Sequence, residues 1–158
     1  MTFAFELHRV FEHFLEVALG AAVRRRGARL VRQPTGHSLD HERTLGLEPD
    51  FVVETRHGRP ISVLDAKFKR LEQNLGGDAY QLLAYLLEFR PRYGFLVSAT
   101  GTSNDRRVRA VDKVLRVRPL ALDQAPERVL AEVDDLADEA IAGDRHVEAS
   151  ETAAYATA

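Results

Sequence analysis

Two aspartates and a lysine stand at the ends of strongly hydrophobic runs in this sequence. Asp50 precedes the run at residues 51–53, and Asp65 and Lys67 flank Ala66 at the end of a second run. Two carboxylates and the backbone carbonyl of Ala66 offer the oxygen ligands that Mg²⁺ prefers, with water and a substrate phosphate completing its shell. A metal held in this way activates water and neutralises the charge that builds on a phosphate. With Lys67 positioning the water and the scissile phosphate, these residue types indicate phosphodiester hydrolysis.

A β-hairpin is predicted to bring these residues together. Strands are expected at residues 48–55 and 60–68, on either side of a polar turn. Facing residues in such a hairpin have numbers that sum to about 115 or 116, so Asp50 falls opposite Asp65 or Ala66. Cβ atoms of facing residues lie about 4.5–5.5 Å apart. The two carboxylates are therefore expected to converge.

The second strand of this hairpin is predicted to be a central strand of a sheet. Side chains alternate between the two faces of a strand. One face carries Ile61, Val63, Asp65 and Lys67, and the other carries Leu64, Ala66 and Phe68. Because both faces are largely apolar, the strand is expected to be covered on both sides. Charged groups in such surroundings are costly unless something pairs with them.

Two helices are predicted to supply further groups to the site. Residues 3–26 form an amphipathic pattern, with Glu12 on the flank of its apolar stripe. Glu12 is thus placed to add a metal ligand or an outer-shell contact. Residues 79–90 form a second helix, on which Asp78, Gln81 and Tyr85 make one polar stripe. Gln81 and Tyr85 are placed to orient the lysine, the water or a nucleic-acid backbone. The buried side of this second helix is predicted to comprise Leu82, Leu83, Leu86, Leu87 and Phe89.

The remaining elements complete a single domain. A short strand is predicted at residues 28–33, a strong one at 93–99, and one or two strands within 106–119. An acidic amphipathic helix is expected at 126–141. Residues 144–158 are small and polar and are expected to form a disordered tail. The folded domain is therefore predicted to span residues 1–143.

Two local patterns leave alternatives open. His37 and His41 stand in the polar loop at residues 34–45, which predicts either a structural metal site or, more simply, a mobile loop beside the active site. The alternation in Leu115-Arg116-Val117-Arg118 puts both arginines on one face. That face is suited to meet phosphates, or it is a solvated edge protected against aggregation.

Composition narrows the class of protein. Residues 1–122 carry 20 Lys and Arg against 14 Asp and Glu, whereas residues 123–158 carry 2 against 10. A basic body with an acidic C-terminal segment is compatible with nucleic-acid contact through the body. The absence of cysteine excludes disulfides, a thiol nucleophile and thiolate metal sites. With neither a signal-peptide pattern nor a membrane-spanning run, a cytoplasmic protein without membrane contact is expected.

The motifs resemble those of the PD-(D/E)xK nuclease superfamily. Pro49-Asp50 and Asp65-Ala66-Lys67 stand at its two motif positions, and Gln81-x-x-x-Tyr85 is similar to the QxxxY helix of the RecB-like branch. Three longer stretches indicate a narrower family within this superfamily. Phe11-Glu12, Leu64-Asp65-Ala66-Lys67-Phe68-Lys69 and Asp78-Ala79-Tyr80-Gln81-Leu82-Leu83-Ala84-Tyr85 resemble the nuclease domain of McrC-type subunits of modified-cytosine restriction systems.

This resemblance implies a restriction-endonuclease-like α/β fold, with a mixed β-sheet flanked by helices. It implies Mg²⁺-dependent DNA cleavage, with Mn²⁺ able to substitute, and site roles for Glu12, Asp50, Asp65, Lys67 and Gln81. We expect further DNA contacts from Lys69, Arg70, Arg106 and Arg107. No Walker motif is present, so an AAA+ GTPase or ATPase motor is expected as a separate partner. A homodimer would bring together two active sites, one for each strand of the DNA. The alternatives are a stand-alone repair or junction-resolving nuclease and a non-catalytic DNA-binding module with the same fold.

Overall fold

The computed structural model describes residues 2–68 and 75–155, with side chains described for 6–68 and 75–142. Its centre is a six-stranded sheet of order β1-β4-β5-β6-β8-β7. The strands are β1 (Arg29–Arg32), β4 (Phe51–Glu54), β5 (Pro60–Lys67), β6 (Tyr93–Ser98), β7 (Asn104–Arg107) and β8 (Val114–Pro119). Pairing is antiparallel for β1–β4, β4–β5 and β7–β8, and parallel for β5–β6 and β6–β8. The predicted mixed sheet of an α/β protein is thus confirmed. A separate two-stranded ribbon pairs β2 (His37–Ser38) with β3 (Gly46–Leu47).

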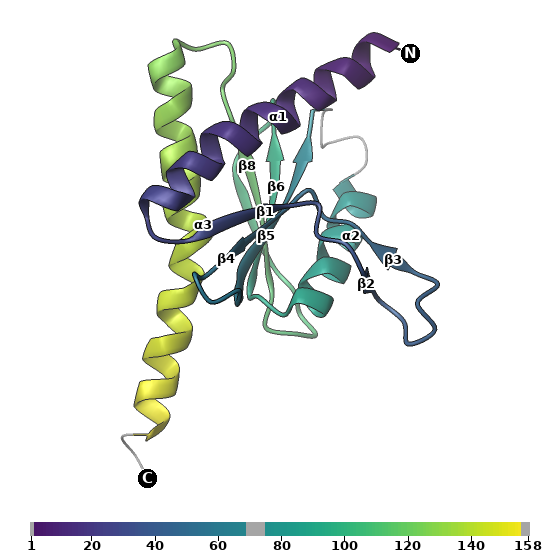
Figure 1. The fold of residues 1–158 in the computed structure, drawn as a ribbon, viewed down its shortest axis with the longest axis vertical. Helices are drawn as coiled ribbons and strands as arrows, with labels where there is room; N and C mark the ends of the chain where they lie inside the picture. The colour runs from purple at the N-terminus through teal and green to yellow at the C-terminus, as the bar shows by residue number, and fades with distance from the viewer. Residues whose placement is uncertain (1, 69–74, 156–158) are drawn as a thin grey trace.

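Helices cover both faces of the sheet (Figure 1). The helices α1 (Thr2–Arg25) and α3 (Pro126–Tyr155) cover one face, where their apolar side chains share a core with Leu64 and Phe95 of the sheet. The helix α2 (Leu75–Phe89) covers the other face, where its apolar side chains pack on Val63 and Leu96. The strand β5 is therefore buried between two layers, as its two apolar faces predicted.

The register of the β4–β5 hairpin follows the prediction over most of its length. Phe51 faces Leu64 and Val52 faces Val63, so the paired numbers sum to 115. The register then shifts, because Val53 faces Ser62 whereas Glu54 faces Pro60. Ile61 is the extra residue of this β-bulge. It joins the core under α1 and α3 together with Leu64, not the face of Val63 to which strict alternation assigned it.

Both later helices are longer than predicted. The helix α2 begins at Leu75, upstream of the predicted start at residue 79, because tertiary packing overrides the low helix propensity of Gly76 and Gly77. Its side chain at Leu87 is 46% exposed, although the sequence placed it on the buried side. The helix α3 continues to Tyr155, through the segment expected to be a disordered tail. That segment is rich in alanine, the strongest helix former. The domain limit at residue 143 stays a prediction.

Among the described residues, no helix combines the length and apolar character that crossing a bilayer requires.

Candidate active site

The hairpin places the two aspartates and the lysine at one end of the sheet. Asp50 directly precedes β4, and Asp65 and Lys67 are among the last three residues of β5. The backbone N–H of Ala66 donates a hydrogen bond of 2.7 Å to Asp50 Oδ2. The backbone N–H of Gln33 holds the Asp50 carbonyl at 2.9 Å. Asp50 is thus fixed from both neighbouring strands, in the convergence that the hairpin register predicted.

Lys67 is surrounded by oxygen atoms from two elements. Its Nζ lies 2.6 Å from Asp65 Oδ2 and 3.4 Å from Asp78 Oδ1 at the start of α2. It also donates a hydrogen bond of 3.3 Å to Gln81 Oε1. Burial lowers the pKa of Lys67, but the surrounding carboxylates outweigh this effect and leave the pKa raised. The ammonium group is therefore held charged and in a fixed position beside the carboxylates.

Gln81 and Tyr85 form a relay of hydrogen bonds behind Lys67. Gln81 Nε2 donates to Tyr85 Oη at 2.8 Å, and Tyr85 Oη donates to the carbonyl of Glu48 at 3.2 Å. Tyr85 is only 2% exposed, and its burial together with the charges of Asp65 and Asp50 raises its pKa. The phenol therefore stays protonated and connects α2 to the chain that leads into Asp50. Gln81 and Tyr85 lie on one side of α2 and Gln81 contacts Lys67, and the role of Gln81 in orienting the lysine stays a prediction.

Glu12 approaches the site from α1. It is 8% exposed, and its Oε1 lies 2.7 Å from His8 Nε2, while Oε2 lies 3.9 Å from Arg32. Its charge raises the pKa of Asp50, which places the two carboxylates within electrostatic reach. Among the described residues, no group of three or more His, Asp or Glu side chains forms a ready metal cluster. A direct ligand role for Glu12 therefore stays a prediction.

The two aspartates repel each other in a buried position. Burial, followed by the charge of Asp50, raises the pKa of Asp65 to about 6. Burial also raises the pKa of Asp50, against the hydrogen bond from Ala66. Asp65 Oδ2 lies 2.6 Å from Lys67 Nζ, and this contact opposes the rise in the pKa of Asp65. Two neighbouring buried carboxylates, one of which raises the pKa of the other, fit a hard divalent cation, which usually takes only one or two carboxylates from the protein.

The residues expected to contact DNA lie elsewhere or outside the described part. Lys69 and Arg70 fall outside the described residues. Arg106 and Arg107 are exposed on β7, at the edge of the sheet farthest from β1. Following the register across the sheet, Arg107 pairs with Val114, Val114 with Tyr93, and Tyr93 with Ser62. Arg107 is thus level with the start of β5, whereas the aspartates and Lys67 lie at its end.

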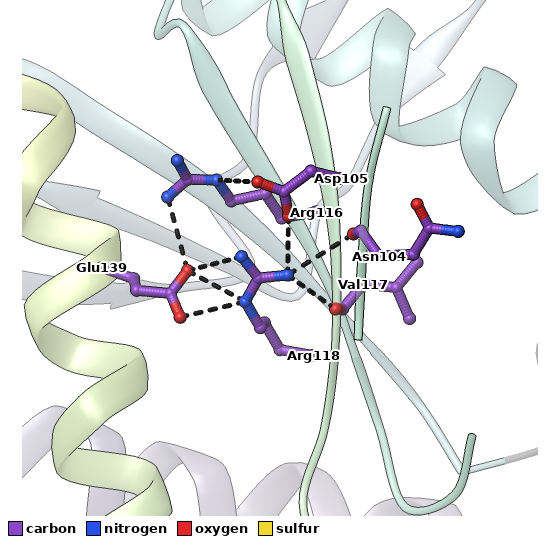
Figure 2. Close-up of polar contacts among 6 residues, drawn as sticks. All are labelled: Asn104, Asp105, Arg116, Val117, Arg118 and Glu139. Atoms are coloured by element: carbon purple, nitrogen blue, oxygen red, sulfur yellow. Dashed lines mark hydrogen bonds and ion pairs between the residues drawn. The ribbon is translucent and has the colours of Figure 1, made fainter. Parts of the chain in front are cut away.

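The arginine face of β8 is internally paired (Figure 2). Arg118 lies 2.8 Å from Glu139 of α3 and 2.8 Å from Asp105 of β7. Arg116 reaches the same acids at 3.4 and 3.3 Å. The sequence left a phosphate-binding face and a solvated edge as alternatives, and these contacts show a third arrangement, because the acidic helix α3 packs beside this face.

The loop histidines are not gathered into a metal site in the part of the chain that the structure describes. His37 Nδ1 lies 3.1 Å from Glu88 Oε1, and its ring is 4.2 Å from the ring of Phe89. The ribbon of β2 and β3 is thereby held against α2, while His41 is exposed. Helical spacing makes His8 a neighbour of Glu12, and the structure shows the two in contact. Sequence reasoning missed the contact of Arg32 with Glu12, because the two residues lie on different elements.

The fold and this site together define an α/β protein with a buried acid pair and a lysine at the open end of a central hairpin. Against models of known families, residues 1–98 match the McrBC 5-methylcytosine restriction system component. The match spans more than half of the chain, so the chain belongs to this family. Membership makes it a restriction-system component and implies the other components of such a system as partners. A search of curated proteins finds no match.

Proposed function

We propose that this protein is a metal-dependent DNA endonuclease, the nuclease component of a McrBC-like restriction system. The observation that carries the proposal is the convergence of Asp50 and Asp65 beside Lys67, where burial raises both aspartate pKa values, assisted by the charge of Glu12 at Asp50 and by the charge of Asp50 at Asp65. Such strongly perturbed groups concentrate at functional sites. The match to a restriction-system family supplies the biological setting.

Hydrolysis of a phosphodiester adds a water oxygen to phosphorus and releases one ester oxygen, which takes up a proton. Asp50, Asp65 and the carbonyl of Ala66 would hold Mg²⁺ or Mn²⁺, with Glu12 as a further or outer-shell ligand. The bound cation would lower the pKa of its water and neutralise charge on the phosphate. Lys67 holds the attacking water or a phosphate oxygen in place. Gln81 fixes Lys67, and Tyr85 fixes Gln81.

The family setting implies a separate AAA+ GTPase or ATPase motor and leaves room for a homodimer that cuts both strands. Two alternatives keep the same fold. A stand-alone repair or junction-resolving nuclease would use the same site without a motor. A non-catalytic DNA-binding module would have no use for the buried acid pair, whose charges are costly to keep in a protein that binds no metal.

The test is cleavage of supercoiled plasmid with Mg²⁺ or Mn²⁺ by the wild type, Lys67→Ala and Asp65→Ala. We expect nicked and linear plasmid from the wild type and neither product from the variants. Thermal melts with each metal run beside the assay, because a missing motor would silence cleavage without preventing metal binding. An inactive wild type whose melting temperature responds to neither metal would overturn the proposal in favour of the binding module.

A further inference from the structure

A basic groove runs between α1 and β1, on the opposite side of the sheet order from Arg106 and Arg107. Its volume is about 650 Å³, and its floor includes Gly20, Ala21 and Leu30. Helix and strand approach closely here, since a Cβ at Gly20 would lie in van der Waals contact with Leu30 at 3.6 Å. The groove is lined by four arginines, at positions 24, 29, 32 and 56, and by one acid, Glu16.

Two of these arginines lack a carboxylate partner among the described residues. Arg29 is paired with Glu54 at 2.6 Å, and Arg32 is shared between Glu16 and Glu12 at 3.5 and 3.9 Å. Arg56 instead donates through Nε to the carbonyl of Gly27, which leaves the rest of its guanidinium group facing solvent. Arg24 is exposed and makes no ion pair in the described part of the chain. The groove therefore carries net positive charge that the protein itself does not neutralise.

The groove starts at the candidate active site. Arg32 contacts Glu12, and the next residue, Gln33, donates its N–H to the Asp50 carbonyl. From there β1 runs back to Arg29, which faces Glu54 near the β4–β5 turn that carries Arg56. Figure 1 shows β1 returning beside α1 after the chain reverses. The three-residue step from Arg32 to Arg29 covers about 10 Å of strand. One strand of B-DNA carries about three phosphates over that length.

We propose that this groove binds the sugar-phosphate backbone of the DNA strand that enters the active site, with Arg24 and Arg56 as phosphate contacts at the end remote from Asp50. The inference rests on the proposed function and adds the path of the substrate. Arginine suits this task because its planar guanidinium group pairs with phosphate in a bidentate manner. The small and apolar residues of the groove, Gly20, Ala21 and Leu30, lie against the sugars of the DNA backbone.

The test is binding of fluorescently labelled DNA, as duplex and as single strand, to the full chain in EDTA across a salt series. The variant is Arg24→Ala/Arg56→Ala. The matched control is Arg109→Ala/Arg128→Ala, which removes the same charge from two exposed arginines on other surfaces. We expect the groove variant to bind roughly tenfold more weakly and to lower the salt slope by about 2, since each neutralised phosphate contributes about 0.9. The control should bind as the wild type does.

The groove proposal would be overturned if the groove variant kept the DNA affinity and salt slope of the wild type. It would also be overturned if the control variant lost as much DNA affinity as the groove variant. A wild type that binds neither form of DNA would overturn it as well. The plasmid assay separates this result from the proposed function. If cleavage depends on Lys67 but neither its rate nor its KM changes in the Arg24→Ala/Arg56→Ala variant, the groove proposal alone is overturned. Binding through the groove by a wild type that cuts no plasmid, and whose melting temperature responds to neither Mg²⁺ nor Mn²⁺, supports the groove and overturns the nuclease.

Discussion

The two edges of the sheet differ in how completely the arginines at and beside them are paired with acids. At the edge formed by β7 and β8, Arg116 and Arg118 are paired with Asp105 and Glu139. At the other edge, beside β1, Arg24 and Arg56 have no acidic partner among the described residues. Acids of the helix α3 account for much of this difference, because Glu139 pairs with both Arg116 and Arg118. The same helix pairs Arg25 and Arg26 of α1 through Asp134 and Asp138. We therefore expect the paired edge to serve stability, whereas the groove that we propose for DNA lies at the other edge.

The largest expected effect comes from Asp50→Asn. The amide keeps an oxygen that can accept from Ala66 N–H, but it removes one of two repelling charges and one metal ligand. We expect plasmid cleavage to fall on the order of 10³-fold. The melting temperature of the metal-free protein at pH 7 should rise by about 2–4 °C, equivalent to about 1 kcal/mol. The matched change at the other edge, Asp105→Asn, should leave cleavage intact. An equal loss of cleavage in both variants would contradict the functional difference between the two regions.

Acidification should selectively weaken metal binding by the acid pair of the candidate active site. A cation needs ionised aspartates, and the pKa of Asp65 is raised from 3.8 to about 6. Metal affinity should therefore fall as the pH drops through about 6, by about tenfold per pH unit for one proton. Without metal the sign reverses: the folded state binds the proton more tightly than the unfolded state, so stability decreases as the pH rises from about 4 to 6. Melting curves at pH 5 and 7.5, with and without Mn²⁺, check both signs. A metal-induced shift of equal size at both values would contradict the assignment.

The paired edge should respond in stability and not in cleavage. Glu139→Gln weakens the contacts with both Arg116 and Arg118, which are partly buried. We expect a loss of about 1–2 kcal/mol in the free energy of unfolding, measured by urea titration. Asp135→Asn, an exposed acid of the same helix, is the control and should change little. A specific cleavage defect in Glu139→Gln, after correction for the folded fraction, would show that this edge takes part in function.

The smallest effect is expected from Tyr85→Phe. The change removes the hydroxyl that joins Gln81 to the Glu48 carbonyl, while Lys67 keeps its contact with Asp65. We expect kcat to fall about threefold to tenfold, the equivalent of one hydrogen bond, with the Mn²⁺-induced melting shift preserved. Tyr80→Phe is the control, because Tyr80 is 75% exposed. A loss of the metal shift in Tyr85→Phe would place the relay in metal binding and not in the orientation of Lys67.

The sequence predicted what local geometry determines. A short turn fixes the register of a hairpin, so Asp50 could be placed opposite the Asp65–Ala66 pair, and helical spacing set Gln81 and Tyr85 on one stripe. Alternation also put Arg116 and Arg118 on one face. It could not reveal that Glu139 covers that face, because the pairing depends on tertiary packing between distant segments. The bulge at Ile61 and the early start of α2 escaped prediction for the same reason.

The late position of α3 in the chain has a consequence for synthesis. The first 122 residues carry six more basic than acidic residues, and the acids that pair Arg25, Arg26, Arg116 and Arg118 lie mainly on α3. A chain synthesised only as far as residue 122 would therefore carry a net positive charge of six, and the acids of α3 would still be missing from these arginines. Because domains generally fold as units, the sheet and its covering acids are expected to assemble together once α3 has been made.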